Sequence, residues 1–216
     1  ITTAAIEART SYIHINGGHI QFADVGGALT GGAVLPLSQP HDSGEFTIKT
    51  GKLTAHRYVM LAATGNIDAG NIELLPNESP VPLGAHDVRI HANVGKEDAP
   101  PLKIGGGTNG AASITVQGTT DYGPQKTGKI FLTNGPSGDI VLDGAKIHVT
   151  NEHDGTPSLI ASAGTGQVTV KGNIVFDGTA TAPAGQILLV GDEIRSTGAT
   201  LSAKDTLSAA AENPAK

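Results

Sequence analysis

The sequence predicts an all-β protein built as a parallel β-helix (a β-solenoid) with irregular loops. A phrase of twelve residues occurs at Gly138–Val149 and again at Gly166–Asp177, with a weaker copy from Gly185. Each copy begins with glycine and a polar residue, alternates apolar residues with others, and breaks at a second glycine. The chain also has 30 glycines, only 3% aromatic residues and no tryptophan, which favours many short strands joined by tight corners. Strand, glycine corner and strand in succession is the pattern expected of one β-solenoid layer.

The alternation predicts which side chains face the interior. Ile140 and Leu142 share one face of a strand, because successive side chains point to opposite faces. The pattern resumes at Ile147, five positions after Leu142. Because five is an odd number, Ile147 would point to the opposite face if the strand continued without a break. A bend or bulge at Gly144 would turn Ile147 and Val149 inward again. The predicted interior aliphatic stack is Ile140, Leu142, Val168, Val170, Ile174, Ile187 and Leu189.

The N-terminal half alternates expected strands with loops. Residues 53–64 have a periodicity that permits a helix, but the neighbouring pattern favours strands. The segment Gly65–Leu74 contains the start of this phrase twice, and the two copies begin five residues apart. Further strands are expected at 19–23 and 46–50, and loops at 26–44, 76–86 and 95–101. Prolines mark 76–86 as an exposed loop, because proline cannot donate to a central ladder.

In the C-terminal half, the sequence predicts short strands at 88–90, 102–104, 113–117 and 129–133 before the central phrase. Residues 1–205 are expected to form a single β-helical domain, with the Ala-rich segment 206–216 as a tail or linker. Layers of ~20–25 residues would give about nine or ten of them. The uneven spacing of the glycine-bounded phrases suits an irregular β-helix, and a β-sandwich, which also uses many short alternating strands, is the alternative fold.

Composition excludes several classes of protein. The net charge of −6, a pI of about 5.7 and the lack of any Lys/Arg cluster argue against nucleic-acid binding. The absence of cysteine excludes a disulfide scaffold but is compatible with secretion. No apolar run approaches the ~20 residues of a membrane helix, so no membrane insertion is expected. Because the chain begins with Ile1, we expect an excised domain or mature product, with a trimmed piece of a cytoplasmic protein as the alternative.

Two glycine-rich motifs resemble nucleotide-binding loops but lack essential parts. Gly105–Gly110 has the spacing of a dinucleotide-binding loop, yet Ala111–Val116 is too short and too β-branched for the helix required, so a turn is expected. Gly123–Lys129 resembles a phosphate-binding loop, but Ile130 stands where a serine or threonine would hold magnesium. We therefore expect no catalytic residue and no cofactor.

His148, His153 and Asp154 are weak candidates for a metal site. A loop separates the two histidines, and acidic residues lie beside the second. Oxygen and imidazole ligands in such a loop suit a metal ion, but solvated surface histidines are the expected alternative. Polysaccharide lyases and hydrolases also occur on β-helices. The Asn-Thr-Asp, Asp-Asp and Gly-His-Gly elements of polygalacturonase-like hydrolases are missing from this sequence. A carbohydrate-active enzyme remains an alternative function.

Phrases that open with Gly-Asn-Ile, Gly-Asp-Ile or Gly-Gln-Val resemble the repeat region of filamentous haemagglutinin-type exoproteins, which Gram-negative bacteria export by two-partner secretion. The matching segments are Gly65–Leu74, Gly138–Val149, Gly166–Asp177 and Gly185–Ile194. The resemblance implies a right-handed parallel β-helix, secreted or at the cell surface, with a non-catalytic structural or adhesive role. Implied partners are glycans or proteins of a host or neighbouring cell, bound through loops. Self-association end to end, as a fibre subunit, is a further alternative.

Overall fold

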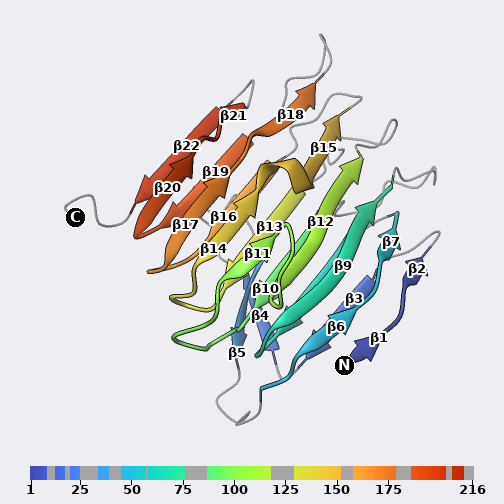
Figure 1. The fold of residues 1–216 in the computed structure, drawn as a ribbon. Coiled ribbons are helices and arrows are strands. Elements are labelled where there is room, and N and C mark those ends of the chain that lie inside the picture. The colour runs from blue at the N-terminus through green and yellow to red at the C-terminus, as the bar shows by residue number, and fades with distance from the viewer. Residues whose placement is uncertain are drawn as a thin grey trace.

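The computed structural model is all-β. It describes residues 1–8, 13–17, 20–24, 34–38, 45–56, 58–75, 87–117, 129–151, 158–178, 186–202 and 206–211. These residues form sheets of thirteen, seven and two strands, and the two large sheets are parallel (Figure 1). The described residues contain no α-helix, only the 3-10 turn η1 (Gly144–Lys146). The all-β prediction is confirmed, whereas the two large sheets are parallel and not the antiparallel sheets of a β-sandwich.

The thirteen-stranded sheet has two runs of strands side by side. Along the first run the strands are β1 (Thr2–Thr3), β6 (Ile48–Thr50), β9 (Ile67–Leu74), β12 (Gly110–Gln117), β11 (Leu102–Ile104), β14 (Ile140–Asp143), β17 (Gln167–Lys171) and β20 (Glu193–Thr197). The second run consists of β2 (Ile6–Ala8), β7 (Leu53–Ala55), β15 (Ile147–Asn151), β18 (Ile174–Gly178) and β21 (Leu201–Ser202). These strands pair with one another or with the second halves of β9 and β12.

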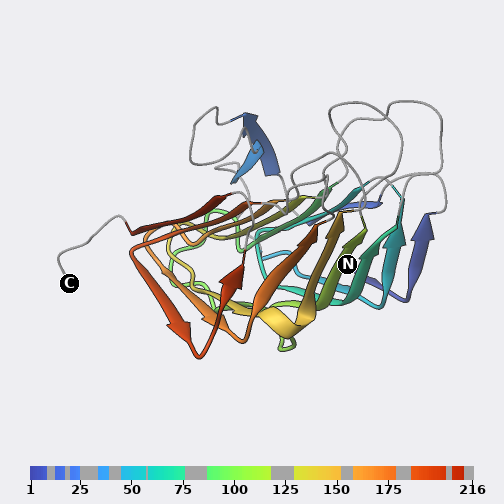
Figure 2. The same ribbon diagram turned by 90° about the horizontal axis from the view of Figure 1, so that it is seen from above.

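The seven-stranded sheet forms a third side. Its order is β22 (Thr206–Ala211), β19 (Gln186–Gly191), β16 (Ser158–Ser162), β13 (Lys129–Asn134), β10 (Asp87–Ala92), β8 (Tyr58–Ala63) and β3 (Ile13–Gly17). Figure 2 shows the thirteen-stranded sheet folded along its length, so that its two runs and the seven-stranded sheet surround a common interior. The chain runs along the three sides in the same order again and again, and one such circuit of three strands is called a pass here. For example, β14, β15 and β16 form one pass, and β17, β18 and β19 form the next.

The corner between the first two sides requires glycine, as predicted at Gly144. Here the chain forms η1, and Ile147 and Val149 beyond it are buried again, which confirms the predicted bend. A Cβ on Gly144 would collide with the backbone of Asn173 in the next pass. Gly70 has the same role within β9, where a Cβ would lie 2.7 Å from the carbonyl carbon of Gly51. Glycine occupies these corners because adjacent passes approach too closely for a side chain.

The predicted aliphatic stack is confirmed, since all seven of its residues are at most 1% exposed. Ile140 lies in register with Val168, which lies in register with Ile194 on β20. The third copy of the phrase, from Gly185, lies on a different side from the first two copies. Its residue Ile187 is on β19, in the seven-stranded sheet. The alternation is the same on every side of the interior, so the sequence pattern does not distinguish one side from another.

Strand β11 adds an extra layer to the first side. It lies between β12 and β14, and only residues 105–109 connect it to β12, with which it pairs in parallel. Parallel strands ordinarily need a connection of about a dozen residues or more. This short connection has glycines with φ between +106° and +141° at 105, 106, 107 and 110, a region that side chains disfavour. The expected turn at Gly105–Gly110 is therefore confirmed, with a strand rather than a helix after it.

Other expectations need correction. The expected loop 26–44 contains β5 (Val34–Ser38), which pairs antiparallel with β4 (Ile20–Asp24). Pro36 is tolerated there because both strands of a two-stranded hairpin are edges. Residues 206–211, expected in a tail or linker, form β22, since the edge of β19 offers them ladder partners. The estimate of nine or ten layers is wrong among the described residues, where the third side has seven strands, because the hairpin and long connections use up residues.

The expected strands at 53–64 are confirmed as β7 and β8. The segment Gly65–Leu74, in which the phrase occurs twice, is a single strand from Ile67 that bends at Gly70 and serves both sides of the thirteen-stranded sheet. The loop expected at 95–101 contains turns and bends, and Lys96 pairs with Glu45 at 2.5 Å. The loop expected at 76–86 lies outside the described residues.

Replacing Val170 by aspartate is expected to destabilise the protein strongly. Val170 is fully buried, so V170D would place an unpaired charge in the aliphatic interior and lower the free energy of unfolding by about 3–5 kcal/mol or more. Val141 is only partly buried, and V141D should change it by no more than ~1 kcal/mol. Urea unfolding followed by circular dichroism measures both. Equal stabilities of the two variants would contradict the inward orientation of Val170.

A comparison of the Gly110→Ala and Gly106→Ala variants distinguishes the cost of backbone strain from the cost of a steric collision. Both glycines have positive φ, so alanine at either position costs ~1–2 kcal/mol of strain. A Cβ on Gly110 would also collide with the carbonyl oxygen of Lys103, whereas a Cβ on Gly106 meets nothing within 4 Å. G110A should therefore be less stable than G106A by at least ~2 kcal/mol in urea unfolding. A G110A variant as stable as G106A would mean that β11 and β12 are not so closely paired.

Candidate functional site

A polar hollow lies where the chain turns from the seven-stranded sheet into β14, β17 and β20. Its volume is about 490 Å³, and three successive passes contribute to it. The lining side chains are all polar: Ser137, Asp139, Thr165, Gln167, Asp192, Glu193 and Arg195. The hollow occurs at this corner because residues just before each strand of the first side lie one above another in register.

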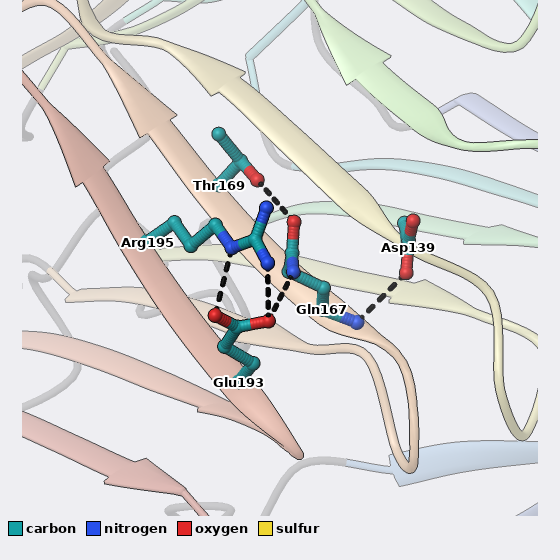
Figure 3. Close-up of polar contacts among 5 residues, drawn as sticks. All are labelled: Asp139, Gln167, Thr169, Glu193 and Arg195. Carbon is teal, nitrogen blue, oxygen red and sulfur yellow. Dashed lines mark hydrogen bonds and ion pairs between the residues drawn. The ribbon is translucent and has the colours of Figure 1, made fainter. Parts of the chain in front are cut away.

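Hydrogen bonds link the three passes through Gln167 (Figure 3). The backbone N–H of Gln167 donates to Asp139 Oδ1 at 2.8 Å. Its side-chain Nε2 donates to Glu193 Oε2 at 2.6 Å, and the Thr169 hydroxyl donates to Gln167 Oε1 at 3.1 Å. Both ends of the Gln167 amide are therefore engaged, which holds its side chain across the strands.

Arg195 and Glu193 form a two-pronged ion pair on the surface of β20. Arg195 Nε lies 2.7 Å from Glu193 Oε1, and Nη2 lies 2.9 Å from Oε2. The hydrogen bond from Arg195 lowers the pKa of Glu193, and the same bond raises the pKa of Arg195, with a smaller contribution from Asp139. Both side chains are exposed to water, so the pair contributes little to stability. Its effect is to orient two charged groups at the edge of the hollow.

The pKa shift of Glu193 does not suit this residue to act as a general acid. A general acid works best when its pKa lies near the operating pH. The pKa of Glu193 is shifted in the opposite direction, away from neutrality. Glu193 therefore acts as a fixed hydrogen-bond acceptor rather than as a proton donor.

A second polar cluster lies on the outer face of the seven-stranded sheet, along β10. Asp87 is buried and accepts a 2.6 Å ion pair from Arg89 Nη2. The guanidinium carbon of Arg89 lies 5.1 Å from the centre of the Phe131 ring, a cation–π contact. His91 Nδ1 and Thr133 Oγ1 are 2.9 Å apart. Figure 2 shows the hairpin β4–β5 on this side of the sheet.

Sequence reasoning assigned no role to this cluster. Alternation places Val88 and Ile90 inward and Asp87, Arg89 and His91 on the outer face, where polar side chains are usually solvated. Yet His91 is fully buried on the outer face. Burial, with a smaller effect from the Arg89 charge, lowers the pKa of His91 to about 3. His91 is therefore neutral at physiological pH and serves as a buried hydrogen-bonding group.

Of the three candidate metal residues, only His148 lies within the described residues. His148 is exposed on β15, in register with Thr115 of β12. His153 and Asp154 lie outside the described residues. Within the described ranges, no three histidine or acidic side chains lie close enough to hold a metal ion. The Gly123–Lys129 motif lies outside these ranges except for its last residue, Lys129, at the start of β13.

No family model, curated protein or solved structure matches this chain. In the part of the chain that the structure describes, no helix is long and apolar enough to cross a membrane. The function of the chain is therefore inferred from its own residues.

His91 should make stability depend on pH. Its pKa is depressed in the folded state, so between pH 6.5 and 3 the unfolded chain binds a proton that the folded chain excludes. Stability should therefore be complete above pH 6.5 and fall as the pH drops, with His91 contributing a loss of up to about 3 kcal/mol by pH 4.

Urea unfolding of wild type and His91→Gln at several pH values isolates this contribution. H91Q should lose the His91 part of the pH dependence, whereas His148→Gln, at an exposed position, should retain it. Parallel stability curves for wild type and H91Q between pH 6.5 and 4 would contradict the assigned burial of His91.

Proposed function

We propose that the chain is a right-handed parallel β-helix that serves as a non-catalytic structural and adhesive module of a bacterial surface or secreted protein. The observation that carries the proposal is the regular succession of parallel strands on three sides of one aliphatic interior. In such an arrangement each pass pairs with the passes before and after it, so stiffness accumulates along the stack. A stiff rod of this kind suits presentation of contact surfaces away from a cell.

The division between interior and exterior supports an adhesive role. The interior holds aliphatic side chains from all three sides, such as Leu142, Val149 and Leu159. Outward positions and connections can vary without disturbing this interior, so they are free to carry contacts. The proposed contact regions are the polar hollow at β14, β17 and β20 and the segments 26–44, 76–86 and 95–101.

We further propose that the chain belongs with the filamentous haemagglutinin-type exoproteins. The glycine-bounded phrases support this, because Gly70 and Gly144 stand at corners where passes crowd one another. A corner of this kind would impose the same phrase on each layer of such a repeat region. On this proposal the chain is secreted or at the surface of a Gram-negative bacterium, and its partners are glycans or proteins of a host or neighbouring cell.

Two other functions are outcomes of the same test. A carbohydrate-active enzyme on this fold is the first alternative, although the lowered pKa of Glu193 does not suit that carboxyl group to act as a general acid. Assembly end to end is the second alternative; among the described residues, β3 and β22 are the edge strands of the seven-stranded sheet. Edge strands present unpaired N–H and C=O groups that invite further strands.

Binding and turnover measurements on the folded chain distinguish these functions. We expect retention on immobilised glycans or host-matrix proteins without release of new reducing ends or unsaturated products, with heat-unfolded chain as the control. Turnover of an acidic polysaccharide that is lost on calcium removal would instead identify a lyase. Filaments that form at neutral pH in proportion to protein concentration would identify a fibre subunit.

A further inference from the structure

We propose that the polar hollow at β14, β17 and β20 binds a neutral, hydroxyl-rich saccharide. This inference rests on the proposed adhesive function and names the ligand class of one contact region. The volume of about 490 Å³ lies within the range of ~300–1,000 Å³ found for small-molecule sites. Three carboxylates, one guanidinium, one amide and two hydroxyls surround it.

The charges of the lining select against charged ligands. Asp139, Asp192 and Glu193 would repel a sugar that carries a carboxylate, such as a uronate. Arg195 is paired with Glu193, and within the described residues no three histidine or acidic side chains lie close enough to hold a metal ion, so a metal cation is not the expected ligand. A neutral sugar avoids the repulsion, and its hydroxyls can donate to carboxylates and accept from the guanidinium or from hydroxyl groups.

The hydrogen bonds among the lining residues leave acceptors available for such a ligand. Asp139 uses Oδ1 for the Gln167 N–H, and its Oδ2 has no recorded partner within the described chain. The Asp192 carboxylate and the Ser137 hydroxyl likewise have no side-chain hydrogen bond among the described residues, although the Asp192 backbone N–H donates to Gly166. These groups line the same hollow as Gln167, Glu193 and Arg195.

The same hydrogen bonds organise the hollow in advance. Gln167 is fixed at its backbone and at both ends of its amide, and Glu193 at both carboxylate oxygens. A ligand therefore does not need to order these side chains, which reduces the entropy cost of binding. No aromatic ring lines the hollow, so a single site should bind weakly, and tight attachment would require several copies acting together.

Nuclear magnetic resonance titration of the folded chain with maltose, cellobiose and digalacturonate tests the inference. We expect a neutral disaccharide to shift backbone amide signals at 137–139, 165–167 and 192–195. Digalacturonate should bind more weakly than the neutral sugars. Asp192→Ala should weaken binding about tenfold, because it removes a charged acceptor. Asp68→Ala removes the same charge at a partly exposed position on β9, away from the hollow, and should leave the affinity unchanged.

Three results would overturn the inference: no shift at the hollow with either neutral disaccharide, tighter binding of digalacturonate, or equal affinities of D192A and wild type. Failure at the hollow together with glycan retention elsewhere on the chain would leave the adhesive function standing. Cleavage of any of the sugars during the titration would instead overturn the non-catalytic function.

Discussion

The register between successive passes is the constraint on which the rest of this structure depends. Each strand of the two large sheets pairs in parallel with the strand one pass away, so an inward residue such as Val168 has inward neighbours, Ile140 and Ile194, on both sides. A slip of one residue would turn every aliphatic side chain of that strand outward. The same register brings the corners together, which is why Gly70 and Gly144 cannot carry side chains.

Buried amides maintain this register where the chain leaves the ladders. Asn93 Nδ2 donates to Asn134 Oδ1 at 2.9 Å, and Asn134 and Asn109 both donate to the carbonyl of Pro100. Asn109 also accepts the backbone N–H of Ile67 at 3.1 Å. These bonds lie beside the extra strand β11, where an added layer interrupts regular pairing. Buried backbone groups need partners, and the asparagines supply them where the neighbouring strand does not.

The two polar clusters outside the interior differ in what they can do. Asp87, Arg89 and His91 lie on β10 of the seven-stranded sheet, where Asp87 and His91 are buried, and His91 is neutral at physiological pH. The hollow around Gln167 is open to solvent and carries charged groups whose positions are set by hydrogen bonds. Burial makes the first cluster a determinant of stability, whereas access to solvent makes the second available for contact.

The sequence by itself determined the facing of the strands and the place of the Gly144 corner, because alternation and glycine freedom are local properties of the chain. It did not determine which side of the interior Ile187 faces, since every side has the same alternation. It also could not bring Asp139 and Glu193 to the same hollow, because Asp139 and Gln167 are 28 residues apart and Gln167 and Glu193 are 26 apart. The connections between the strands have irregular lengths, so these sequence separations do not predict which residues become neighbours. Only the parallel pairing of one pass with the next decides which distant residues meet.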